Sequence, residues 1–173
     1  NIDFNTAFLD GSKFEADANK YKFVWKPTKY HQKLSDKIRI ILSKYELSRN
    51  VPETGIIPAT TIADKITKFN NLISNIDISD KSNKEIFKDY EVLKSALIKS
   101  LEYEEKEKIC GPDRNSYYKT DHDATAMCLK RDYYSGLGTN THAAYNTQII
   151  VCKGLIATYY VSQSRSDLKD LIP

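Results

Sequence analysis

Apolar residues recur at two different spacings along the chain, and the change of spacing divides it into segments. Within residues 4–17, aromatic and aliphatic side chains flank Asp10 and then alternate with charged ones, which predicts a β-strand. The pair Asp10-Gly11 also fits a tight hairpin turn. Strand and turn therefore both remain open for this segment.

Further along, the apolar spacing changes to three or four residues, which predicts three amphipathic helices. We expect these helices over about 29–48, from Ile62 to Ile76, and from a capping box at Ser82 and Glu85 to Leu101. The segment 50–55 contains proline and glycine and is expected to end the first helix. Such stripes predict helix packed against helix in a small hairpin or bundle.

Residues 110–142 have no sustained period and are expected to be mostly loop, with a short helix at 124–130. This segment contains four side chains that resemble a metal cluster at first sight: Asp121, His122, Asp123 and Cys128. Their spacing matches no zinc pattern, so a loop and helix-cap role is predicted instead. The sequence offers no recognisable partner for His31 or His142.

Strict alternation returns over residues 145–152, and the Lys-Gly pair at 153–154 is a two-residue turn signal. A β-hairpin is therefore expected, in which the apolar run 155–161 is mostly buried. Ser166 and Asp167 predict the cap of a further helix, and Asp167 is interpreted as a cap rather than a metal ligand.

Composition limits the class of protein. The chain has 173 residues, of which 40% are hydrophobic and 28% charged, so a folded domain is expected rather than a disordered or membrane protein. No apolar run approaches the roughly 20 residues of a spanning helix. The three cysteines are odd in number and unpatterned, which favours a reducing, cytoplasmic environment over a disulfide framework.

The net charge is only +3, but the charge is unevenly distributed. Basic residues outnumber acidic ones between positions 11 and 45, whereas 102–107 is acidic. Lysines interleave with aromatic residues in the basic segment, where lysines would hold phosphates and a ring would stack on a flipped or frayed base. The candidate DNA contacts are Lys13, Lys20, Lys22, Trp25, Lys26 and Lys29. A solvated helix face, and a core role for Phe23 and Trp25, remain open alternatives.

Three sequence blocks occur in a definite order. The first block is Leu9-Asp10-Gly11-Ser12-Lys13 through Asn19-Lys20-Tyr21 to Phe23-Val24-Trp25-Lys26. The second block is Arg114-Asn115-Ser116-Tyr117-Tyr118-Lys119-Thr120-Asp121-His122-Asp123-Ala124-Thr125. The third block is Ala144-Tyr145-Asn146-Thr147-Gln148-Ile149, followed by Gly154-Leu155-Ile156, Asp167 and Leu171-Ile172-Pro173. Together the blocks resemble the catalytic region of insertion-sequence transposases with a DDE, RNase H-like domain. Cys152 departs from the family's usual acidic residue, and Ser12 replaces a more usual threonine.

The resemblance implies an α/β fold: a partial RNase H-like domain with a first strand, a helical insertion, a β-hairpin and the start of a helix. The implied segments are 1–27 for the first strand and basic segment, 28–110 for the helical insertion, and 111–173 for the loop, hairpin and helix start. The chain is interpreted as an internal piece of a longer protein.

The resemblance also implies a function, namely cutting and joining transposon-end DNA with two divalent ions, Mg²⁺ or Mn²⁺. Asp10 occupies the position of the family's first catalytic aspartate, a metal ligand on the first strand. The second aspartate and the glutamate are expected beyond Pro173, so the chain alone is expected to be inactive. Transposon-end DNA and a homo-oligomer are the expected partners, with no membrane and a cytoplasmic, nucleoid-associated location.

Two other classes of function remain open. One is a non-catalytic nucleic-acid-binding module that keeps the basic face. The other is a helical module in which residues 29–108 mediate self-association.

Overall fold

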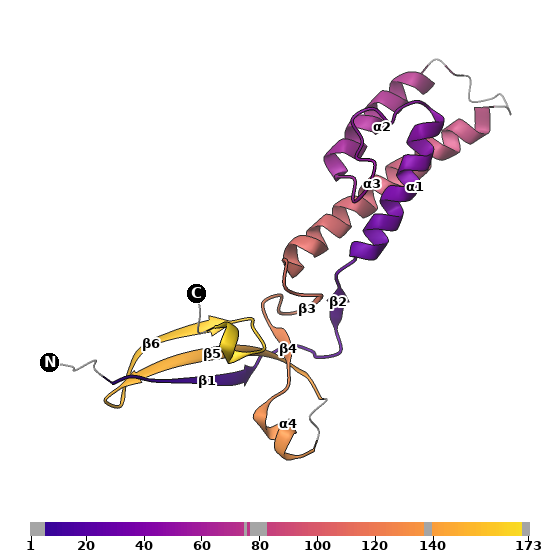
Figure 1. The fold of residues 1–173 in the computed structure, drawn as a ribbon. Coiled ribbons are helices and arrows are strands. Elements are labelled where there is room, and N and C mark those ends of the chain that lie inside the picture. The colour runs from indigo at the N-terminus through magenta and orange to yellow at the C-terminus, as the bar shows by residue number, and fades with distance from the viewer. Residues whose placement is uncertain (1–5, 75, 77–82, 137–139, 171–173) are drawn as a thin grey trace. The chain divides into compact units, whose positions relative to one another are not determined.

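The computed structural model describes residues 6–74, 76, 83–136 and 140–170 (Figure 1). The chain divides into two units. Asn1–Trp25 and Arg114–Pro173 belong to the first, called here the sheet unit, and Lys26–Asp113 form the second, the helical unit. These boundaries lie within a few residues of the expected 27/28 and 110/111. Helices and an antiparallel sheet occur together, as the predicted α/β class requires.

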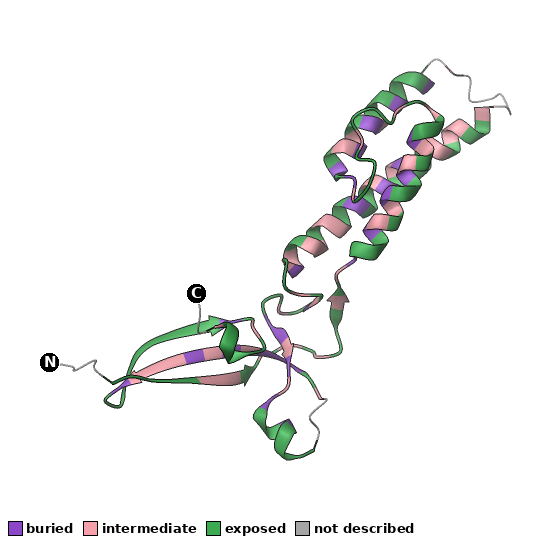
Figure 2. Cartoon of the chain, in the orientation of Figure 1, coloured by how far each residue is buried: buried purple, intermediate pink, exposed green. Residues whose placement is uncertain are grey.

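The helical unit contains α1 (Thr28–Lys44), α2 (Ala59–Ile73) and α3 (Lys84–Cys110), which confirms the three predicted helices. Buried side chains recur every three or four residues in α1 and α2, and Figure 2 shows buried positions along each of the three helices. The core of this unit is formed by Ile38, Leu42, Ile57, Ile62, Phe69, Ile73, Leu93 and Ala96. The stripes identified in the sequence therefore pack helix against helix.

The helix ends differ from the predicted ones for local reasons. α1 ends earlier than residue 48, because Glu46 adopts a left-handed conformation with φ 57°. α3 continues past Leu101 to Gly111, which has φ 65° and whose N–H donates to the Glu107 carbonyl at 3.0 Å. Of the predicted capping box, Ser82 lies outside the described residues, and the N-cap of α3 is Asn83, without a side-chain cap bond.

The sheet unit is organised around β5 (His142–Cys152). β1 (Phe8–Glu15) pairs with one edge of β5, while β4 (Thr125–Met127) and β6 (Leu155–Ser162) pair with the other, all antiparallel. A separate two-stranded ribbon joins β2 (Phe23–Trp25) to β3 (Ser116–Tyr118). Among the described residues, β1 pairs only with β5, so its outer edge is free.

The strand interpretation of residues 4–17 is confirmed over β1, and the turn alternative is wrong. Asp10 lies opposite Ile149, and Gly11 lies opposite Gln148, within a continuous ladder. The predicted hairpin is also confirmed, since Lys153 and Gly154 both have positive φ, at 49° and 79°, as a two-residue hairpin turn demands.

Two other expectations about the sheet unit are wrong. The run 155–161 was expected to be mostly buried, but β6 is exposed along all of it, because the described residues place nothing over its faces. The short helix expected at 124–130 is replaced by β4, and a short helix, α4 (Lys130–Tyr134), follows. Pairing of β4 with distant β5 outweighs the local sequence signal there.

Candidate functional site

Asp10 lies in the middle of β1 with an exposed side chain. Because side chains alternate across a strand, Asp10 shares a face of the sheet with its β1 neighbours two residues away and with the β5 residues opposite them. This surface, called here the Asp10 face, comprises Asp10, Ser12, Phe14, Tyr145, Thr147 and Ile149. Hydroxyl groups and apolar side chains thus surround the exposed Asp10 carboxylate.

The opposite face carries a buried polar cluster. Asn146 is fully buried and donates to Asp167 Oδ1 at 2.8 Å and to Asp170 Oδ2 at 3.1 Å. Gln148 donates to the same Asp167 oxygen at 2.9 Å, and Ser162 donates to Asp170 at 2.6 Å. These bonds fasten the 3-10 helix η2 (Asp167–Lys169) to the sheet.

Gly11 is required where η2 meets β1. A Cβ at this position would lie 2.7 Å from Asp167 Oδ1 and 2.6 Å from Gln148 Nε2. The glycine therefore permits close approach of η2 rather than a turn. The predicted capping role is wrong, since neither Ser166 nor Asp167 makes a side-chain cap bond; Asp167 accepts the two sheet amides instead.

This geometry limits what can join Asp10 in binding a metal. Asp167 and Asp170 contact side chains of the opposite face, so the sheet separates them from Asp10. Cys152, buried at the end of β5, belongs to that face as well. No three His, Cys, Asp or Glu side chains converge on a metal-binding position anywhere in the described ranges. Asp10 suits a hard cation, but one carboxylate does not form a two-metal centre.

The predicted DNA contacts within the sheet unit do not form one patch. Lys13 is opposite Asn146 and therefore lies on the face away from Asp10. Lys20 donates to Asn140 Oδ1 at 3.3 Å, and its ammonium lies 5.2 Å from the centre of the Tyr21 ring. Lys22 is exposed beside β2, where Trp25 is also exposed.

Trp25 and Phe23 are not core residues. Their side chains remain 65% and 41% exposed, so the alternative in which they anchor a core is wrong. The two rings meet edge to face, with centroids 5.4 Å apart. The pair thus leaves aromatic surface accessible to solvent on β2.

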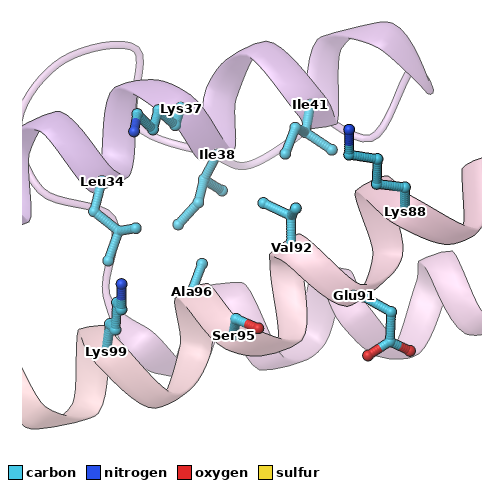
Figure 3. A pocket seen from close by; sticks show the side chains of 10 residues that line it. All are labelled: Leu34, Lys37, Ile38, Ile41, Lys88, Glu91, Val92, Ser95, Ala96 and Lys99. Carbon is cyan, nitrogen blue, oxygen red and sulfur yellow. The ribbon is translucent and has the colours of Figure 1, made fainter. Parts of the chain in front are cut away.

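The other two predicted DNA contacts belong to the helical unit. Lys26 donates to the Gly111 carbonyl at 2.6 Å, next to the C-terminal end of α3, while Lys29 is exposed in the first turn of α1. A pocket of about 340 Å³ lies between α1 and α3 (Figure 3). Its lining is Leu34, Lys37, Ile38, Ile41, Lys88, Glu91, Val92, Ser95, Ala96 and Lys99, an apolar floor with lysines at its rim.

Sequence reasoning missed the partners of His142, which come from distant positions. Its Nδ1 lies 2.7 Å from Glu15 at the end of β1, and its Nε2 lies 3.2 Å from buried Asp132 in α4. Hydrogen bonds from His142 and then from Arg131 hold the pKa of Glu15 below its usual value. The pairing of β5 with β1 and with β4, which precedes α4, brings these groups together, so no local signal could reveal them.

Asp121 performs the loop role predicted for its cluster. Its carboxylate accepts the backbone N–H groups of Asp123 and Ala124, each at 3.2 Å, and the Tyr145 hydroxyl at 2.5 Å. The Tyr145 hydrogen bond lowers the pKa of Asp121. Burial, with the same bond, raises the pKa of Tyr145 to about 12. The loop before β4 is thus tied to the Asp10 face.

In the helical unit, His31 joins Glu107 to Ser100 in the order seen in hydrolytic triads. Its Nδ1 lies 3.1 Å from Glu107 Oε2, and its Nε2 lies 3.0 Å from the Ser100 hydroxyl oxygen. Both His31 and Ser100 are fully buried, so no substrate can reach the hydroxyl. The trio therefore connects α1 to α3 and has a structural role.

Comparison of the chain with protein-family models, with curated proteins and with solved structures finds no match. Among the described helices, none combines the length and the apolar character needed to cross a bilayer. The arguments for function therefore depend on the residues themselves.

Proposed function

We propose that this chain is part of the RNase H-like catalytic domain of a DDE transposase, which cuts and joins transposon-end DNA. The observation that carries the proposal is the position of Asp10, exposed in the middle of a first strand that pairs with the centre of an antiparallel sheet. The resemblance of the sequence blocks places the first catalytic aspartate at this position. The free outer edge of β1 leaves room for further strands of such a sheet.

Asp10 supplies one ligand of the proposed centre. When two Mg²⁺ or Mn²⁺ ions are bound by such a domain, they activate the attacking oxygen and stabilise the leaving one. In the described ranges no three possible ligands converge, and Asp121, which is tied to the Asp10 face, is bonded to Tyr145, so the remaining ligands have to come from elsewhere. We accordingly expect the chain alone to bind DNA without cleaving it.

The lysines support the DNA part of the proposal. Lys22 and Lys29 are exposed, each on its own unit, and Lys20 is half-buried. Contacts of this kind neutralise phosphates and make binding weaken as salt rises. Homo-oligomer formation belongs to the proposal as well, because both ends of an element must be held for joining.

Cleavage of the element's own DNA ends by the protein that contains this chain tests the proposal. Cleavage that requires Mg²⁺ or Mn²⁺ and stops with a chelator is the expected result. Salt-sensitive DNA binding with no cleavage under any divalent ion would contradict it and would select the non-catalytic binding module.

The helical self-association module is the second alternative, and one observation favours it. The pocket between α1 and α3 combines apolar Leu34, Ile38, Ile41 and Val92 with a lysine rim, and Ile40 and Ile98 are each 70% exposed. Sedimentation analysis distinguishes this function: concentration-dependent assembly without DNA binding would select it.

A further inference from the structure

The ribbon formed by β2 and β3 presents flat aromatic surface to solvent. Phe23 and Trp25 are two residues apart on β2 and therefore share a face of the strand. Their rings are nearly perpendicular, at 88°, so the edge of one ring covers a single face of the other. Together with exposures of 41% and 65%, this leaves ring surface available for stacking by another planar group.

Two lysines extend the same ribbon. The Lys119 N–H donates to the Lys22 carbonyl at 3.0 Å, which continues the ladder one step beyond the Phe23–Tyr118 pair. Like charges at directly opposite positions destabilise an antiparallel pair. Both lysines are exposed, and neither makes an ion pair within 4.0 Å in the part of the chain that the structure describes. An anion between them would relieve the repulsion.

A third cation, Arg165, acts electrostatically on Tyr118 of β3. Tyr118 is buried on that strand, and its burial raises the pKa of its hydroxyl, while the exposed Arg165 guanidinium acts in the opposite direction. Because side chains alternate across a strand, the ribbon carries the aromatic pair on one face and Lys22 and Lys119 on the other. A phosphate satisfies the cations, and a base satisfies the rings, so the ligand combines both groups.

The ligand is single-stranded. In a duplex, neighbouring base pairs cover the flat faces of each base, whereas an unpaired base offers a face to a protein ring. An acidic peptide would satisfy Lys22 and Lys119 but would leave Phe23 and Trp25 without a flat partner. The lysine stems are flexible and long enough to follow a phosphate around the narrow ribbon.

We propose that the β2–β3 ribbon binds single-stranded DNA, with one base stacked on the Phe23–Trp25 pair and an adjoining phosphate held by Lys22 and Lys119. This deepens the proposed function and rests on it, because it takes DNA to be the natural ligand; it does not depend on metal binding by Asp10.

Trp25 is the only tryptophan of the chain, so its fluorescence reports on this site alone. Titration of the chain with a short oligothymidylate is expected to give saturable quenching at low salt. A fluorescein-labelled oligothymidylate, followed by anisotropy, measures the affinity of variants without tryptophan. Trp25→Ala is expected to weaken binding on the order of tenfold, and Trp25→Phe by much less, since phenylalanine still stacks.

Charge and control variants complete the experiment. Lys22→Gln and Lys119→Gln are each expected to lower the slope of log affinity against log salt by about 0.7. Tyr134→Ala is the matched control, because Tyr134 is an aromatic residue of the sheet unit that is 89% exposed but lies on α4. It is expected to leave binding unchanged. Circular dichroism checks that each variant is folded.

Several results would overturn the inference. They are the absence of quenching, an equal loss from Trp25→Ala and Tyr134→Ala, equally tight binding of the matching duplex, and displacement by polyglutamate as effective as displacement by unlabelled oligothymidylate. Asp10→Asn serves to separate the two proposals. This variant is expected to bind oligothymidylate as tightly as the wild type. Its loss of metal-dependent end cleavage would support the catalytic proposal and would say nothing against single-strand binding by the ribbon.

Discussion

Replacing Gly11 with alanine tests the contact between β1 and η2, on which the arrangement of the sheet unit depends. The added Cβ would lie 2.6 Å from Gln148 Nε2, 2.7 Å from Asp167 Oδ1 and 2.8 Å from Asp167 Cγ. Ordinary contacts between such atoms are about 3.5–4.0 Å. Something must therefore move, and η2 is joined to the sheet by side-chain hydrogen bonds and not by a strand ladder.

The cost follows from the bonds that this movement breaks. Asp167 Oδ1 accepts the side-chain amides of Asn146 and Gln148, which are 0% and 5% exposed. A buried donor left without an acceptor costs about 1–3 kcal/mol, and overpacking without movement costs a similar amount. We expect Gly11→Ala to lower the free energy of unfolding of the sheet unit by about 2–4 kcal/mol.

Urea denaturation measures this change. Trp25 belongs to the sheet unit, so its fluorescence follows that unit, while circular dichroism at the helix band follows the helical unit. The urea midpoint seen by fluorescence should fall, and the circular dichroism midpoint should move less. The double variant Gly11→Ala/Asp167→Ala should be less destabilised than the sum of its single variants, since Asp167→Ala removes carboxylate atoms that the new methyl group would meet. A loss under about 0.5 kcal/mol for Gly11→Ala would refute the close approach.

Further predictions concern a helix cap and the effect of pH. Glu104 Oε1 accepts the Ala59 N–H at 2.7 Å at the start of α2, so Glu104→Ala should cost about 1 kcal/mol in thermal unfolding followed by circular dichroism, whereas exposed Glu105→Ala should cost almost nothing. The pKa of Asp121 is lowered in the folded state, so its carboxylate stabilises the fold above its unfolded pKa, and this stabilisation is lost as pH falls. Tyr145→Phe removes the hydrogen bond that lowers this pKa and should therefore reduce stability more at pH 7 than at acidic pH. The pKa of Tyr145 is raised to about 12, so the stabilisation from its protonated hydroxyl is complete below about pH 10 and should disappear as pH rises through 12. Equal stability of the wild type and Tyr145→Phe at pH 7 would contradict this account.

The sequence predicted those helices and turns that are determined by residues close to one another in the chain. The β5–β6 turn requires positive φ at Lys153 and Gly154, and the helical stripes pack within a contiguous stretch of chain, so both were visible in the sequence. α3 extends further than its apolar stripe, because its final turns are rich in Glu and Lys, which are good helix formers and form pairs such as Glu102–Lys106.

Long-range contacts explain what the sequence left hidden. Asn146 and Gln148 are polar and alternate with apolar residues, a pattern typical of the solvent-facing side of a strand. Both are nevertheless buried, because the carboxylates of Asp167 and Asp170 accept hydrogen bonds from their side-chain amides. β4 is too short to show a period and exists through its ladder to β5. For the candidate site, the sequence left strand and turn open at Asp10, and once the segment is a strand, the three-residue spacing puts Lys13 on the opposite face.

The role of Asp10 as a metal ligand is tested most directly by substituting it in the protein that contains this chain and measuring cleavage of transposon-end DNA. Asp10→Asn should abolish cleavage in Mg²⁺ while DNA binding persists. Asp10→Cys should be inactive in Mg²⁺ and regain cleavage in Mn²⁺, since the softer cation accepts a thiolate. Cleavage by Asp10→Asn at the wild-type rate would contradict the proposed catalytic role.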